Sequence, residues 1–292
     1  MSCDTGGPMI EGRPSETALH TAAARAAHRL LDPEPHLLED VGAAELLGTD
    51  GEALIESYRD DGPWVLVENR IFIPLRARYV EDRLRAAYLN GARQYVVLGA
   101  GLDSFTFRQP ALLGELAIFE VDHPSTQDWK MARIDSLGWS VPDNTQFVPC
   151  DFETTLISGA LRDVGFDPAL RTVVGWMGVV YYLDKQTVAA SLADLGTILA
   201  DESELVMDYM RPWDELPTRY LELREAMTSY LKGMGEPHVN RYPRGEIVQV
   251  IRDAGFKRAS TVNHRELHDR YLAPLATKIP ISERFGLAVA TK

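Results

Sequence analysis

The chain alternates between two hydrophobic patterns. Short apolar runs rich in β-branched residues and bounded by turn residues, such as QYVVLGAG from Gln94, predict strands that are buried on both faces. Stretches with apolar residues at helical spacing, such as KQTVAASLADLGTILA from Lys185, lie between several of these strands. This alternation predicts an α/β fold, with a mostly parallel sheet covered by helices on both faces.

The same patterns predict the organisation of the whole chain. Helices are expected over 17–31, where Ser15 or Thr17 would cap the first turn, and over 71–89. Further strands are predicted in LAIFEVDHP, TQFVPCDFE, RTVVGWMGVVYYL and SELVMDYM, and RGEIVQVIRDAGFKRASTV and RFGLAVATK complete the sheet. We therefore expect an N-terminal helical cap (1–90), a ligand-binding core (91–210), an inserted helical lid (211–245) and a C-terminal completion of the sheet (246–292). The aromatic and methionine side chains of the insertion form either a lid over a ligand or that segment's own core.

Composition excludes several classes of partner. The 292 residues include 30 basic and 43 acidic ones, a formal charge of −13, so nucleic acid is not an expected ligand. No apolar run approaches the roughly 20 residues that span a bilayer, and the first residues lack the order of a signal peptide. The two cysteines, Cys3 and Cys150, favour a reduced, cytoplasmic setting, in which the protein is a monomer or a homodimer.

Ligands of open parallel sheets bind at the carboxyl ends of the strands, so the residues that follow each strand are candidates for a site. After the first predicted strand, Gly99 and Gly101 allow a ligand to approach the backbone, and Ser104 stands where a dinucleotide fingerprint has its third glycine. A carboxylate at Asp103 repels a diphosphate but attracts a cationic group. The same side chain is equally suited to cap the following helix.

Later strand ends supply further candidates. Asp122 follows the second strand about 20 residues after the glycine turn, where a carboxylate accepts hydrogen bonds from ribose hydroxyls. Asp151 and Phe152 follow the third strand and could contact the edge and face of an adenine ring, although each alone is typical of a turn and a core residue. His123 and His238 are weak catalytic candidates, because a lone histidine is more often structural.

The order of VVLGAGLDSFTFR, FEVDHPSTQDWK and FVPCDFE resembles the leucine carboxyl methyltransferase-like family of class I S-adenosylmethionine-dependent methyltransferases, and in particular its bacterial small-molecule branch. The similarity extends from about Thr17 to Leu183 and returns at DAGF. It implies a Rossmann-like domain with a seven-stranded sheet and S-adenosylmethionine as the cofactor. This molecule carries a sulfonium and an ammonium and no phosphate, which suits the acid at Asp103.

The resemblance also implies roles for single residues. Glycines 99 and 101 would line the methionine part of the cofactor, Asp122 would bind the ribose, and Asp151 with Phe152 would bind the adenine. An arginine from the preceding helix would bind the cofactor carboxylate, with Arg78 as the first choice and Arg76 as the second. Met177 stands where the family often has a glutamate, which removes one charge from the site.

The expected activity is O-methylation of a small molecule, with a carboxylate or an acidic hydroxyl of a secondary metabolite as the acceptor. Such a group arrives ionised, which fits a sequence without an evident base constellation. Two alternatives stay open: a protein that binds S-adenosylmethionine for regulation or other chemistry, and an NAD-dependent oxidoreductase. The missing third glycine and Asp103 count against the oxidoreductase, and no cluster with metal-ligand spacing is present in the sequence.

Overall fold

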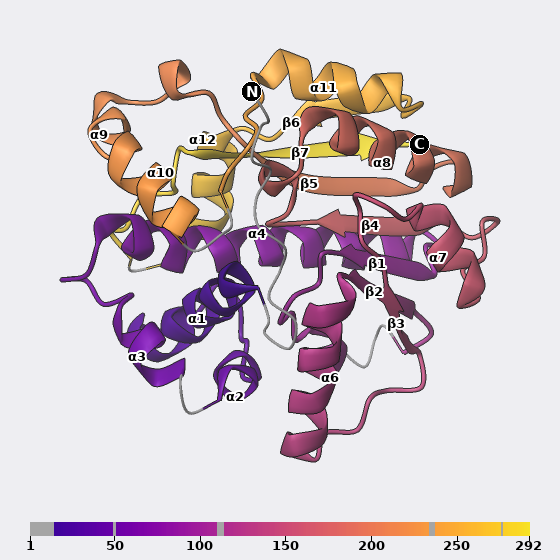
Figure 1. Cartoon of the computed structure of the whole chain (residues 1–292), viewed down its shortest axis with the longest axis horizontal. Helices are drawn as coiled ribbons and strands as arrows, with labels where there is room; N and C mark the ends of the chain where they lie inside the picture. The colour runs from indigo at the N-terminus through magenta and orange to yellow at the C-terminus, as the bar shows by residue number, and fades with distance from the viewer. Residues whose placement is uncertain (1–14, 49–50, 110–113, 234–236, 276) are drawn as a thin grey trace.

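The computed structural model describes residues 15–48, 51–109, 114–233, 237–275 and 277–292. Its centre is one seven-stranded sheet with the order β3-β2-β1-β4-β5-β7-β6, in which β7 is antiparallel to both of its neighbours and the other pairs are parallel (Figure 1). The mostly parallel seven-stranded α/β sheet expected from the sequence is confirmed. Its strands are β1 (Gln94–Leu98), β2 (Ala117–Asp122), β3 (Thr145–Pro149), β4 (Thr172–Trp176), β5 (Glu204–Met210), β6 (Arg258–Thr261) and β7 (Phe285–Thr291).

Helices connect the strands and precede them. The first predicted helix is present, and its Ser15 hydroxyl accepts a hydrogen bond from the amide of Ala18 as a cap. The predicted helix over 71–89 begins earlier, at Trp64. The elements are α1 (Glu16–Leu31), α2 (Ala43–Leu47), α3 (Gly51–Glu56), α4 (Trp64–Leu89), α5 (Phe105–Arg108), α6 (Pro124–Leu137), α7 (Ile157–Asp163), η2 (Val180–Tyr182), α8 (Lys185–Ile198), η3 (Trp213–Glu215), α9 (Thr218–Leu221), α10 (Arg224–Gly233), α11 (Arg244–Asp253), α12 (His264–Leu267) and η4 (His268–Leu272).

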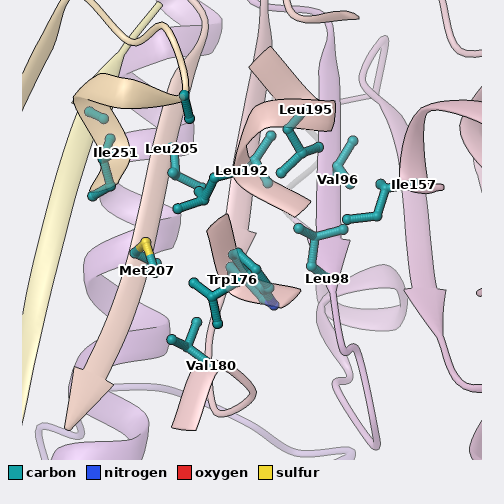
Figure 2. Close-up of a cluster of buried hydrophobic side chains, with 14 of the residues drawn as sticks. Val96, Leu98, Ile157, Trp176, Val180, Leu192, Leu195, Leu205, Met207 and Ile251 are labelled. Carbon is teal, nitrogen blue, oxygen red and sulfur yellow. The ribbon is translucent and has the colours of Figure 1, made fainter. Parts of the chain in front are cut away.

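Alternating side chains of the strands build two cores, one on each face of the sheet. On one face, Val96 and Leu98 of β1 and Trp176 of β4 pack with apolar residues of α7, α8 and α11 (Figure 2). On the other face, Tyr95 and Val97 of β1 pack with the apolar side of α4. Helix α4 therefore lies directly beneath the strands whose ends form the site.

A third cluster joins the N-terminal helices. The alanines of α1 are almost fully buried against residues of α2, α3 and α4. The short alanine side chains let α1 approach α4 closely and place one of its faces near the turn after β1, where Ala18 lies beside Gly101. Within the described residues, none of the helices is both long enough and apolar enough to cross a membrane. Cys3 lies outside the described residues, whereas Cys150 is a buried free thiol.

The core on the helix α8 face yields a stability prediction. Leu192 is fully buried there, so Leu192→Ala is expected to lower the free energy of unfolding by about 2–5 kcal/mol, through lost burial and a residual cavity. The matched control is Leu89→Ala, because Leu89 is 68% exposed at the end of α4, and it should change the stability by less than about 0.5 kcal/mol. Urea denaturation measures both variants. Equal losses in the two would contradict this assignment of the core.

Candidate functional site

A cavity of about 1180 Å³ opens at the carboxyl ends of the central strands. The chain leaves β1 toward β2 and β3 on one side, whereas β4 continues to β5 on the other, so a crevice forms where the strand order reverses. Its walls come from the four strand ends, from α1 and α4, and from the segment after α10. Sequence-predicted residues that line it are Arg76, Gly99, Gly101, Asp103, Asp122, His123, Asp151, Phe152 and Met177.

The turn after β1 needs its glycines. Gly99 and Gly101 have φ of +64° and +53°, in the left-handed region that favours glycine. A Cβ on Gly99 would also lie 2.1 Å from a methyl carbon of Val179, so a larger residue does not fit. Asp103 accepts a hydrogen bond from the amide of Phe105 at 2.7 Å, at the first residue of α5, and it lines the cavity as well. Both interpretations of Asp103 are therefore compatible with its geometry.

Asp122 links β2 to the glycine turn. One carboxylate oxygen accepts a hydrogen bond from the amide of Gly101, and the other accepts one from the amide of His123 at 2.7 Å. Burial raises the pKa of Asp122 to about 6, although the two backbone hydrogen bonds oppose that rise. His123 also lines the cavity, and its Nδ1 accepts a hydrogen bond from the amide of Ser125 at the start of α6.

Residues after β3 and β4 form the adjoining walls. Asp151 accepts hydrogen bonds from the amide of Glu153 at 3.0 Å and from the hydroxyl of Thr154 at 2.9 Å, which fixes its carboxylate in the turn. The ring of Phe152 lies edge-on to that of Trp176, with 6.2 Å between the centroids. Met177 is the first residue after β4 and contributes a partly buried apolar side chain.

The two candidate arginines of α4 lie on different sides of the helix. Arg78 is not among the cavity-lining residues, because its guanidinium pairs with Asp82 at 2.9 Å and donates to the carbonyl of Leu37. Arg76 is buried and lines the cavity, where it forms an ion pair with Asp208. Arg76, the second choice from the sequence, therefore faces the cavity and Arg78, the first choice, does not, since two residues along a helix differ by about 200° in direction.

Asp208 was not identified from the sequence, although it is the single carboxylate in the otherwise apolar run 205–210 of β5. It is fully buried in β5, pairs with Arg76 and accepts a hydrogen bond from the amide of Gly178 at 2.8 Å. Gly178 has a φ of +81° in the turn after β4. A charged residue in a buried strand signals a partner, and that signal could have identified the pair.

Part of the segment after β5 reaches the cavity. Its described lining residues are Pro237 and Val239, whereas Tyr220 and Tyr242 are fully buried. His238 is not a lining residue: its ring packs against Tyr181 and Tyr182, and burial, followed by the nearby Arg241 and Arg284, lowers its pKa to about 3. Tyr242 belongs to the core on the α8 face of the sheet, and the ring of Tyr220 lies 4.9 Å from that of Trp64 in α4, so both aromatic side chains anchor the segment to the rest of the fold.

The cavity wall is acidic. Its carboxylates are Glu81, Asp103, Asp122, Asp151, Glu153 and Asp184, of which Glu81, Glu153 and Asp184 were not identified from the sequence. Its two arginines, Arg25 and Arg76, are already paired with the buried Asp40 and Asp208. Within the part of the chain that the structure describes, no group of three or more His, Cys, Asp or Glu side chains is arranged to hold a metal ion.

Strand order, glycine turn and strand-end cavity together define a Rossmann-like fold of the class I methyltransferase type. Solved structures with this fold cover nearly the whole chain. A DUF574 family protein of Streptomyces avermitilis MA-4680 matches with a TM-score of 0.61 at 14% identity, over 96% of this chain and 98% of its own. A protein of Thermobifida fusca YX described as a methyltransferase matches with a TM-score of 0.56 at 16% identity, over 96% of each chain.

Sequence comparison then identifies the family. Residues 18–196 match the family model described as leucine carboxyl methyltransferase. YktD of Bacillus subtilis strain 168, named as an S-adenosyl-L-methionine-dependent methyltransferase, is 29% identical over 286 residues, or 91% of this chain and 93% of its own. A similarly named protein of Mycolicibacterium smegmatis is 30% identical over 220 residues, or 72% of this chain and 67% of its own. The chain belongs to the leucine carboxyl methyltransferase family of S-adenosylmethionine-dependent methyltransferases, which confirms the resemblance.

The raised pKa of Asp122 predicts a pH dependence of stability. The native carboxyl releases its proton near pH 6 and the unfolded one near pH 3.8, so the native state binds more protons between these values. The contribution of Asp122 to the free energy of unfolding should therefore fall as the pH rises from about 4 to about 6, by about 1–3 kcal/mol.

Urea denaturation between pH 4 and pH 7 measures this change as the difference between the native protein and Asp122→Asn. The matched control is Asp128→Asn on α6, where Asp128 is exposed, and it should follow the native profile. Parallel pH profiles for the native protein and Asp122→Asn would show that burial does not raise this pKa.

Proposed function

We propose that this protein is an S-adenosylmethionine-dependent O-methyltransferase that acts on a small molecule. The supporting observation is the acidic cavity at the reversal of strand order, in a chain that belongs to this family. At about 1180 Å³ the cavity exceeds the roughly 300–1,000 Å³ of most single-ligand pockets, which leaves room for an acceptor beside a cofactor.

The residues present fit the cofactor. Among the described residues, the wall has six carboxylates and two arginines that are already paired, which suits a ligand with a sulfonium and an ammonium better than a diphosphate. The hydroxyl of Thr126 is buried at the same wall and has no hydrogen-bond partner within the described residues, so a polar ligand atom would satisfy it. The acidic wall disfavours the NAD-dependent alternative, and no contact among the residues that the structure describes favours a purely regulatory role.

Roles for the lining residues follow from their positions. We assign the ribose hydroxyls to the carboxylate of Asp122, and the edge and face of the adenine to Asp151 and Phe152. The glycine turn, with His123 beside it, would border the methionine part, and Met177 would form an apolar wall. Arg76 takes the place of Arg78 as the candidate for the cofactor carboxylate, because its Nη2 faces the glycine turn after β4.

The cofactor supplies an electrophilic methyl group on a sulfonium. With the cofactor bound, transfer would be an in-line displacement, in which the acceptor oxygen would form a bond to the methyl carbon as the bond from that carbon to sulfur breaks. The protein mainly has to align the three atoms and exclude water, and such alignment contributes up to about 7–11 kcal/mol. The apolar side chains of Val179, Leu183 and Val239 in the cavity wall serve the exclusion of water.

The acceptor in this proposal is a carboxylate or an acidic hydroxyl of a secondary metabolite. An ionised oxygen needs no general base, and the histidines are poorly suited to act as one. His238 is buried behind Tyr182 with a pKa lowered to about 3, and the Nδ1 of His123 is engaged at the start of α6. The ring of Tyr182 in the cavity wall suits a flat acceptor.

Calorimetric titration tests the proposed function. S-adenosylmethionine and S-adenosylhomocysteine are expected to bind in the micromolar range, and NAD is expected not to bind. Asp122→Ala should weaken the first two about 10- to 100-fold, because hydrogen bonds to a charged group contribute about 1.5–3 kcal/mol. Asp128→Ala, which changes an exposed carboxylate on α6, should have no effect. Binding of NAD in place of S-adenosylhomocysteine would refute the proposal.

A further inference from the structure

An ion-pair cluster lies beneath the glycine turn, between α1, α4 and α5. Arg108 of α5 is at its centre: its guanidinium lies 2.6 Å from Glu81, 3.8 Å from Asp40 and 3.9 Å from Asp103. Arg25 of α1 pairs with Asp40 at 2.7 Å. We call these residues the floor cluster: Arg25, Asp40, Glu81, Asp103 and Arg108.

The charges of the floor cluster do not balance. Its three carboxylates face two guanidiniums, which leaves one net negative charge. Asp40 is fully buried behind the others, whereas Glu81 and Asp103 line the cavity. The excess charge therefore faces the cavity. Burying an unbalanced carboxylate is costly, so a cation in the cavity would relieve that cost.

Tyr95 provides a second, independent observation at the same place. Its side chain is 4% exposed, lines the cavity and packs edge-on against the ring of Phe105. The hydroxyl lies beside Gly175 of β4, where a Cβ would come to 3.0 Å from it, and it has no hydrogen-bond partner among the described residues. Burial, followed by the carboxylates of Asp103 and Glu81, raises the pKa of Tyr95 well above its usual value, so the hydroxyl stays neutral.

We propose that Glu81, Asp103 and Tyr95 form the subsite for the ammonium group of the cofactor. An ammonium has three N–H donors, and these side chains offer three acceptor oxygens around the position of the unbalanced charge. A sulfonium has no N–H group and could not use the Tyr95 hydroxyl in this way. The proposal rests on the proposed function, since it concerns the amino-acid part of S-adenosylmethionine.

Two ligands separate this subsite from the rest of the site. S-adenosylhomocysteine carries the ammonium, whereas 5′-methylthioadenosine has the same nucleoside thioether without the amino-acid part. Calorimetry of Glu81→Gln should show binding of S-adenosylhomocysteine weakened at least about 10-fold and binding of 5′-methylthioadenosine unchanged. Tyr95→Phe keeps the ring packing against Phe105 and should give a smaller loss, again for S-adenosylhomocysteine alone.

The matched control is Asp82→Asn. Asp82 is the next residue of α4, pairs with Arg78 and Tyr271 and is not a lining residue, so its change should affect neither ligand. Met177 lines the same cavity from the end of β4, so the double variant Glu81→Gln/Met177→Glu, which restores the charge, should recover part of the lost affinity. Binding of 5′-methylthioadenosine shows that a variant has kept its folded site.

Equal weakening of both ligands in Glu81→Gln, or no weakening of either, would overturn the subsite while leaving the proposed function intact. A native protein that binds neither ligand would overturn both. The two failures are therefore distinguishable in one set of titrations.

Discussion

Two carboxylates, Asp122 at the end of β2 and Asp208 within β5, hold the backbone of the two glycine turns around which the cavity is built. The carboxylate of Asp122 accepts a hydrogen bond from the amide of Gly101 in the turn after β1. The carboxylate of Asp208 accepts a hydrogen bond from the amide of Gly178 in the turn after β4. Since β1 and β4 are neighbours and β2 and β5 flank them, each turn is fixed by the strand outside it. The crevice between the turns is thereby kept open for a ligand.

Burying these two carboxylates costs free energy of folding, and both hold turns that line the cavity. Asp208 is buried together with Arg76, so its charge is compensated within the protein. Asp122 forms no ion pair among the described residues, and burial raises its pKa even though the two backbone hydrogen bonds and the more distant Lys130 oppose that rise. A second contact also connects β2 to the glycine turn. Lys130 of α6 is buried and pairs with Glu120 of β2, and its ammonium donates a hydrogen bond to the carbonyl of Asp103 at 2.7 Å. Strand β2 thus contacts the glycine turn twice, directly through Asp122 and through the Glu120–Lys130 pair.

Much of this could be predicted from the sequence, because it depends on local patterns. Buried parallel strands are continuous apolar runs, and the residue that follows each run lies at the same edge of the sheet. Gly99, Asp122 and Asp151 were found in this way, and the structure brings all three to one cavity. Their contacts with a cofactor stay predictions.

What the sequence left undecided depends on direction in space. Arg76 and Arg78 are both plausible in a list of residues, but only Arg76 shares a helix face with Ile73 and Val80 and turns toward the cavity. Glu81 has the same difficulty, because its neighbour Asp82 is also acidic yet lies outside the cavity lining. Helical spacing identifies such a face only once the position of the helix against the strands is known.

Other parts of the cavity wall are harder to predict for a related reason. They combine Ala18 and Thr21 of α1, Tyr182 after β4 and Val239 after α10, which are far apart in the chain. No sequence motif or regular spacing connects these residues, because they come together only in the folded structure. The glycine turns tolerate little change in their backbone, whereas these wall side chains can vary without disturbing the turns. Family membership therefore constrains the turns of the cavity far more tightly than the rest of its wall.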